Sequence, residues 1–196
     1  MPLSVSLIIT TFNNPLALHA VLTSVSSQTS LPDQIIVADD GSTDMTAEAL
    51  LNHQNLPIIH AWQPNQDFRA ARSRNLAILR CTSDYIIFID GDCLLPPDFV
   101  ASHLKLAERD KIVSGGRHLL SAEETNQIIE AYPKFESRFL ANWKFKSVAL
   151  GPLRNLHRTN WRIVRTCNVA MHRSTAESAG GFDENFVGWG LEDSDF

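Results

Sequence analysis

Acidic side chains gather where predicted strands end, and they are the residues best suited to chemistry. Asp39 and Asp40 follow one such strand, and Asp90-Gly91-Asp92 follows another. A third group, Glu192-Asp193-Ser194-Asp195, comes after a turn rich in Gly and Trp. The carboxyl ends of parallel strands open on one crevice, so the first two groups should converge there. Two carboxylates around a glycine suit a hard divalent cation, although the same residues can form an Asx turn that only closes a strand.

These acids must be positioned by a chain in which short apolar runs alternate with helical patterns. The run before Asp90 is unbroken, which suits a strand buried on both faces of a parallel sheet. The predicted fold class is therefore α/β, with a mostly parallel central sheet flanked by helices. Strands are predicted at 4–10, 34–39, 57–62, 84–90, 111–114 and 163–171. Helices are predicted from Pro15 after the cap Asn14, from Ser42 or Thr43, over 69–80, from Pro96 and Pro97, and from the capping box of Ser121 and Glu124 to near Pro133.

Composition narrows the class of protein. The chain has 196 residues, of which 44% are apolar and 20% charged, so we expect one globular domain rather than a disordered chain. The longest apolar runs are far shorter than the ~18 residues of a membrane span. The first residues lack the basic region of a signal peptide, which predicts a cytoplasmic location. The three cysteines form no C-x-x-C and are expected to stay reduced.

Charge is unevenly distributed along the chain. The net charge is −5, but residues 137–176 hold eight basic side chains, no acidic one and several interleaved aromatic residues. This segment is either a surface helix and hairpin with solvated charges or a site for an anionic ligand. The ligand would be a diphosphate, an acidic glycan or a lipid-diphosphate at the inner face of a membrane. No RNA-binding motif accompanies the segment, so no nucleic acid partner is expected.

Common nucleotide-binding and catalytic signatures are absent. The sequence contains no G-x-x-x-x-G-K-[ST], G-x-G-x-x-G, G-x-S-x-G or H-E-x-x-H. A diphosphate could still be held by a metal together with Arg69, Arg72 and Arg74 at the start of a predicted helix. The same arginines could equally form a solvated helix face.

Four motifs, in this order and spacing, resemble those of family 2 glycosyltransferases of the GT-A fold. They are Val5–Asn13 (VSLIITTFN), Val37–Asp44 (VADDGSTD), Ala71–Asn75 (ARSRN) and Phe88–Asp92 (FIDGD). The runs Gly180–Phe186 and Gly188–Asp195 are similar to the C-terminal galactosyltransferase signature. This resemblance spans most of the chain. It implies a single catalytic domain over 1–196, with a nucleotide-sugar-binding half at 1–115 and an acceptor-side half at 116–196.

The resemblance also implies roles for individual residues. Thr10 and Phe12 would line the uracil pocket, and Asp40 would accept a hydrogen bond from the base. Arg69 would reach the uracil or the diphosphate, and Asp90 the ribose. The neighbouring Asp39 is expected to be structural, capping its turn through backbone N–H groups.

Further roles implied by the resemblance concern the metal and the acceptor. Asp92 would coordinate Mn2+ or Mg2+ bridging the diphosphate. Asp193 matches the general base, while Trp189 and Glu192 would position the acceptor sugar. Relatives usually continue past this motif, so the end at Phe196 is interpreted as a C-terminal truncation that leaves the third metal ligand unidentified.

The sequence thus favours an inverting, metal-dependent glycosyltransferase. It would move a hexose or N-acetylhexosamine, of galactose type rather than glucose, from a UDP-sugar to the hydroxyl of a glycan or lipid-linked glycan. Surface polysaccharide or glycoconjugate synthesis is the expected setting, with peripheral membrane association through 137–176. One alternative is a UDP-sugar-binding remnant with impaired catalysis. The other is a nucleotidyltransferase, which would normally have a Gly-rich loop after the first strand.

Overall fold

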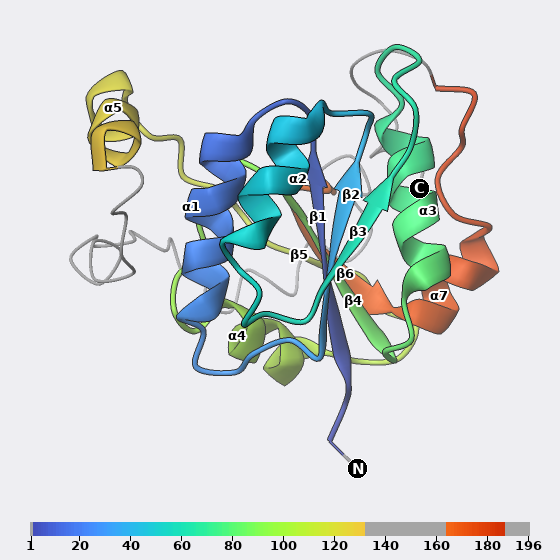
Figure 1. Cartoon of the computed structure of the whole chain (residues 1–196). Coiled ribbons are helices and arrows are strands. Elements are labelled where there is room, and N and C mark those ends of the chain that lie inside the picture. Colours follow the sequence, from blue (N-terminus) through green and yellow to red (C-terminus); the bar gives the residue numbers. More distant parts are fainter. Residues whose placement is uncertain (1, 132–163, 187–196) are drawn as a thin grey trace.

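The computed structural model describes residues 2–131 and 164–186, which form a six-stranded sheet with helices on both faces (Figure 1). The strands lie in the order β3-β2-β1-β4-β6-β5. β1, β2, β3 and β4 are parallel, whereas β6 runs antiparallel to both β4 and β5. The predicted mostly parallel α/β sheet is therefore confirmed. The strand bounds are β1 Val5–Thr11, β2 Gln34–Asp39, β3 Ile58–Trp62, β4 Tyr85–Asp90, β5 Val113–Ser114 and β6 Asn168–His172.

Helices pack on the two faces of this sheet. α1, α2 and α4 contribute to the core on one face, and α3 and α7 lie on the other (Figure 1). The strands alternate between the two cores: Leu7 and Ile9 of β1 face the α1 side, and Ile8 between them faces the α3 side. All three are fully buried. The helix bounds are α1 Pro15–Ser26, α2 Asp44–Leu51, α3 Ala70–Arg80, α4 Phe99–Leu106, α5 Ala122–Ala131 and α7 Arg173–Ala179.

Two predicted helix caps are present. The Asn14 side chain accepts from the N–H of Ala17 at 3.3 Å, and Pro15 occupies the first turn of α1. At the start of α5, the N–H of Glu124 donates to Ser121 Oγ and the N–H of Ser121 donates to Glu124 Oε2. These bonds satisfy N–H groups that a helix start leaves without an intrahelical partner.

Two predicted boundaries were wrong by three residues or more. α4 begins at Phe99 rather than at Pro96, because the Pro96 carbonyl accepts from the Phe99 N–H and from Gln28 in a turn before the helix. The last strand begins at Asn168 rather than at 163, after a turn in which the Asn168 N–H donates to the Arg165 carbonyl. Apolar pattern alone does not reveal these turns.

His19 of α1 and His53, after α2, form a buried pair that the sequence did not predict. His53 Nε2 lies 3.0 Å from His19 Nδ1, and both side chains are largely buried. Burial lowers the pKa of His53 from 6.5 to about 4, and the neighbouring His19 lowers it further in the same direction. Burial also lowers the pKa of His19. The pair is therefore neutral in the folded protein at neutral pH.

The buried pair predicts acid sensitivity of folding. Between pH 6.5 and about 4 the unfolded chain binds a proton at His53 that the folded chain does not, so stability falls as the pH falls through this window. We expect the variant His53→Gln, which keeps a hydrogen bond to His19 but does not titrate, to lose less stability than wild type on acidification. The difference should be on the order of 2 kcal/mol, measured by urea unfolding at about pH 7 and pH 4.5. The exposed His118→Gln is the control, and equal acid sensitivity of wild type and His53→Gln would contradict the prediction.

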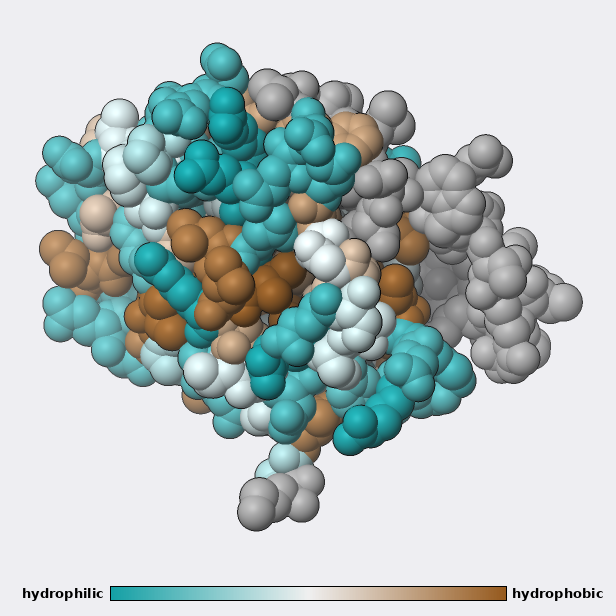
Figure 2. Space-filling model, turned by 90° about the vertical axis from the view of Figure 1, so that its right-hand side faces the viewer, coloured by the Kyte–Doolittle hydropathy of each residue, from teal (hydrophilic) through white to brown (hydrophobic). Residues whose placement is uncertain are grey.

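The face formed by α3 and α7 carries apolar surface surrounded by hydrophilic residues (Figure 2). Leu79 of α3 is 82% exposed, so this helix is only partly covered by the described chain. None of the described helices is both long and apolar enough to cross a membrane.

Candidate functional site

The strand register brings the predicted donor residues to one edge of the sheet. Thr10 of β1 pairs with Asp90 of β4, and Thr11 pairs with Asp39 of β2. Asp40 follows directly, with its N–H donating to the Thr11 carbonyl at 3.1 Å. Three adjacent parallel strands therefore present their ends side by side at the upper edge of the sheet in Figure 1. This is the edge at which open parallel sheets bind ligands.

The turn after β2 is locked in place by Asp39. Its Oδ1 accepts from the Ser42 N–H and its Oδ2 lies 2.8 Å from His60 Nε2. Burial alone would raise the pKa of this carboxyl, but the bonds from His60 and Ser42 outweigh burial and the pKa is lowered. Asp39 is fully buried, in line with its predicted structural role.

Gly41 lets the same turn approach the loop before α3. Its φ is +95°, a backbone region that L side chains rarely adopt, and a Cβ would come within 2.4 Å of the Asn65 backbone nitrogen. Two residues donate hydrogen bonds to Ser42 in this turn. The Asn13 N–H donates to its Oγ at 2.8 Å, and the Trp62 indole donates to its carbonyl at 3.1 Å.

Asp40 faces the start of α3. Its Oδ1 accepts from Gln63 Nε2 at 2.5 Å, and its Oδ2 accepts from the Arg69 N–H at 2.7 Å. Burial raises the pKa of Asp40 despite these two donors, and the charge of Asp39 adds to the rise. The carboxyl is thus buried and held in a fixed orientation by the chain.

Arg69 and Phe12, which were also predicted to bind the donor nucleotide, are more exposed than Asp40. Arg69 occupies the N-cap position of α3 and turns its Nε to the Gln66 carbonyl at 2.8 Å. Phe12, just after β1, is 44% exposed. A half-buried guanidinium and an exposed ring are both accessible to a ligand at the strand ends.

Arg74 connects the ends of β1 and β4. Its Nε donates to Thr10 Oγ1 at 3.3 Å, and its Nη2 lies 3.6 Å from Asp90 Oδ1. The Arg74 side chain is only 5% exposed, and its guanidinium also lies over the Phe182 ring. Arg72, two residues earlier on α3, is exposed. Of the three arginines considered for a diphosphate, Arg74 therefore contacts site residues through its side chain, whereas Arg69 bonds Asp40 through its backbone N–H.

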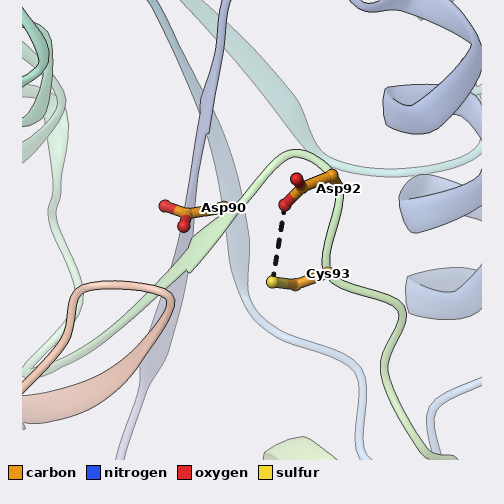
Figure 3. Close-up of side chains that lie close together, drawn as sticks. All are labelled: Asp90, Asp92 and Cys93. Atoms are coloured by element: carbon orange, nitrogen blue, oxygen red, sulfur yellow. Dashed lines mark hydrogen bonds between the residues drawn. The ribbon is translucent and has the colours of Figure 1, made fainter. Parts of the chain in front are cut away.

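Asp90, Asp92 and Cys93 form the candidate metal group at the end of β4 (Figure 3). One potential ligand atom from each residue lies within 4.8 Å of the others. Gly91 makes this possible, since its N–H donates to the Thr10 carbonyl and a Cβ would come within 2.9 Å of that oxygen.

The chemistry of these groups fits a hard cation. Two carboxylates are the ligands that Mn2+ and Mg2+ prefer. The Cys93 thiol donates to Asp92 Oδ1 at 3.6 Å. Burial raises the pKa of this thiol, and the nearby Asp92 and Asp90 charges raise it further, so it stays protonated at neutral pH. Because a hard cation prefers carboxylate oxygen to sulfur, we interpret Cys93 as a neighbour of the two carboxylates.

The structure thus brings six predicted residues to one edge: Thr10, Phe12, Asp40, Arg69, Asp90 and Asp92. The predicted acceptor residues Trp189, Glu192 and Asp193 lie outside the described residues, as does most of the basic segment 137–176. Within the described part of that segment, Arg173 donates to Glu177 and to the Ser83 carbonyl.

Gln63 and Asn75 were not predicted as site residues, and Arg74 was considered only as a contact of the diphosphate. Gln63 holds Asp40, Arg74 holds Asp90, and Asn75 holds the backbone of Phe182. Arg74 and Asn75 belong to the A-R-S-R-N motif, which was a usable signal. Gln63 is part of no motif, and only the fold reveals its contact.

Two family models match the sequence. Residues 6–165 match the one described as Glycosyl transferase family 2. Residues 155–196 match the one described as N-terminal domain of galactosyltransferase.

Curated relatives match almost the whole chain. It is 27% identical over 213 residues to hyaluronan synthase of Pasteurella multocida, covering 97% of this chain and 22% of that protein. It is 30% identical over 209 residues to validoxylamine A glucosyltransferase of Streptomyces hygroscopicus subsp. jinggangensis (strain 5008), covering 96% and 49%. The chain thus spans less than half the length of these relatives.

Solved structures share the fold. The mannosyltransferase PcManGT of Pyrobaculum calidifontis, in complex with GDP-Man and Mn2+, has a TM-score of 0.67 at 20% identity, covering 99% of this chain and 50% of that one. S. aureus TarS 1-349 in complex with UDP has a TM-score of 0.66 at 17% identity, covering 97% and 53%. At this identity the likeness concerns the fold alone.

Proposed function

Because the chain belongs to glycosyl transferase family 2 and has a GT-A-like fold, we propose that it is an inverting, metal-dependent sugar transferase. It moves a hexose or N-acetylhexosamine, of galactose type, from a UDP-sugar to a glycan hydroxyl. The observation that carries this proposal is the convergence of Asp40, Arg69, Asp90 and Asp92 at one carboxyl edge. Polar and acidic groups in this arrangement can hold a base, a ribose and a metal-bound diphosphate.

The donor nucleotide is held along the ends of β1, β2 and β4. Asp40, oriented by Gln63 and the Arg69 N–H, accepts a hydrogen bond from the base. Thr10 and the exposed Phe12 line the base pocket, and Asp90, held by Arg74, contacts the ribose. The choice of uridine rests on the resemblance of the donor motifs, since TarS was solved with UDP and PcManGT with GDP-Man.

Asp92 holds the divalent cation, Mn2+ or Mg2+, next to the diphosphate. A bound cation of this kind acts as a Lewis acid that stabilises charge on the departing nucleoside diphosphate. Asp92 is exposed at the turn after β4, so it is accessible to such a complex. Arg69 supplies positive charge on the same side, where the base or the diphosphate is expected.

The acceptor is handled by the C-terminal motif. Asp193 removes the proton from the acceptor hydroxyl as that oxygen attacks the anomeric carbon, and a single in-line displacement inverts the configuration. Trp189 stacks on the acceptor sugar, and Glu192 accepts hydrogen bonds from its hydroxyls. Relatives named hyaluronan synthase and chondroitin synthase support a growing polysaccharide, free or lipid-linked, as the acceptor.

We assign residues 1–115 to donor binding and residues 116–196 to the acceptor side of a single catalytic domain. The basic segment 137–176 would draw the protein to an anionic, cytoplasm-facing membrane surface where a lipid-linked acceptor resides.

Titration with nucleotides and nucleotide-sugars tests the proposal. With Mn2+ present, UDP should bind more tightly than GDP, and EDTA should abolish binding. UDP should be released from a UDP-hexose or UDP-N-acetylhexosamine only when a glycan acceptor is added. Metal-dependent binding without any UDP release would instead support a donor-binding remnant, and tighter binding of GDP would contradict the assigned base.

A further inference from the structure

Two successive residues of α3 reach in different directions. Arg74 donates a hydrogen bond to Thr10 at the end of β1 and forms an ion pair with Asp90 at the end of β4. Asn75 is bonded to the segment 180–184, which is more than a hundred residues away in the sequence. In Figure 1 the chain after α7 runs beside α3 toward the carboxyl edge of the sheet. One helix turn therefore joins the donor edge to the segment that precedes the proposed acceptor motif.

Asn75 holds this segment with a complementary set of bonds. Its Oδ1 accepts from the Phe182 N–H at 2.8 Å, and its Nδ2 donates to the Phe182 carbonyl at 2.9 Å. Nδ2 also donates to Glu184 Oε1 at 2.9 Å. An amide side chain is needed here, since it alone offers both a donor pair and an acceptor at one carbon.

Two glycines precede Phe182, and the second of them lets the chain approach Asn75 closely. Gly180 and Gly181 have φ of +84° and +80°, and a Cβ on Gly181 would come within 2.6 Å of Asn75 Oδ1. The first of them also caps the C-terminus of α7 in the left-handed conformation. Contact with Asn75 thus explains Gly181, and the left-handed end of α7 explains Gly180.

Phe182 packs this segment against β4 and Arg74. Its side chain is 3% exposed and packs edge-on against Phe88 of β4, with ring centroids 5.6 Å apart. The Arg74 guanidinium lies 5.5 Å from the centre of the same ring. The Phe182 ring thus packs against both β4 and the guanidinium of Arg74.

We infer that Asn75 is a positioning residue for sugar transfer: it docks the segment 180–184 beside the donor edge and thereby sets where the acceptor-side chain departs. The inference rests on the proposed function. Asn75 contacts no proposed substrate group itself. Its loss should impair the alignment of donor and acceptor while leaving the donor residues in place, because Arg74 keeps its own bonds to Thr10 and Asp90.

The variant Asn75→Ala tests this role. We expect kcat for transfer to fall about 100-fold, as small misplacements can do, while the Mn2+-dependent Kd for UDP changes less than about threefold. Hydrogen exchange at the Phe182 amide should become faster at the same time, because its acceptor is removed. Leu79→Ala, on the exposed side of α3, is the matched control and should change none of the three.

A double variant distinguishes the positioning role of Asn75 from a simple loss of folding. In Asn75→Asp with Glu184→Gln, the new carboxylate still accepts from the Phe182 N–H and can accept from the new amide, but it cannot donate to the Phe182 carbonyl, so recovery should be partial. We expect about tenfold recovery of kcat relative to Asn75→Ala. A stabilising contact alone would instead weaken UDP binding together with kcat, and that result would overturn the inference, as would an unchanged kcat.

The outcomes separate the inference from the proposed function. Wild-type chain that binds and transfers while Asn75→Ala does the same refutes only the inference. Wild-type chain that neither binds UDP with Mn2+ nor transfers a sugar refutes the proposed function, and the inference fails with it.

Discussion

Replacing Asp92 by alanine should weaken Mn2+-dependent UDP binding by at least about 100-fold. Asp92 is the exposed carboxylate of the group at the end of β4, and its loss leaves Asp90 as the only carboxylate among the three residues. Removing a partner that merely orients a ligand costs about 10–100-fold in metal affinity, so removing a ligand itself should cost at least as much. Calorimetric titration of UDP with Mn2+ and with EDTA gives the measurement.

Two controls sharpen this result. Asp110→Asn removes an exposed charge from the loop after α4 and should leave UDP binding unchanged. Cys93→Ser should also bind normally, because a hard cation prefers the carboxylate oxygens of Asp90 and Asp92 to sulfur. Residual binding of Asp92→Ala that is still sensitive to EDTA would place the metal on other residues.

The strand ends explain why much of this fold was predictable. Each of the first four strands is an apolar run followed by a polar turn, and each is followed in turn by a helical pattern. Such repeats leave few arrangements other than a parallel sheet. β6 was different. It lies antiparallel between β4 and β5, and no local pattern states which strands it must pair with.

The same distinction holds for the candidate site. The capping role predicted for Asp39 is confirmed by its bond from the Ser42 N–H, whereas the base-binding role of Asp40 stays a prediction. Their partners His60 and Gln63 could not be predicted, since both come from β3 and its end and meet the acids only through strand pairing. Residues that support a site from another element are visible only in the folded chain.

Arg72 and Arg74 show how helix geometry decides between identical side chains. Residues two apart on a helix point to different sides, so only one of them can face the sheet edge. The structure places Arg74 there and leaves Arg72 exposed. His19 and His53 show the opposite case. They lie far apart in the sequence, yet they form a buried pair across α1 and the loop after α2.

Replacing Asp193 by asparagine should lower kcat by about 10²- to 10⁴-fold, which is the usual contribution of a general base. The amide has nearly the same shape as the carboxylate but cannot take the proton of the acceptor hydroxyl. UDP binding with Mn2+ should stay within about twofold of wild type, because the donor groups lie at the ends of β1, β2 and β4. Kinetics of UDP release and a parallel UDP titration provide the two numbers.

Neighbours in the same motif provide the controls for Asp193. Asp195→Asn removes an equal charge two residues away and should not reproduce the loss of kcat. Glu192→Gln should raise the acceptor KM more than it lowers kcat, because it removes hydrogen bonds to the bound sugar. An unaffected rate in Asp193→Asn would show that the base is elsewhere. Asp92→Ala and Asp193→Asn should therefore differ in their effects. The first should lose donor binding, and the second should bind the donor without turnover. This combination is expected only if separate carboxylates perform donor binding and proton removal.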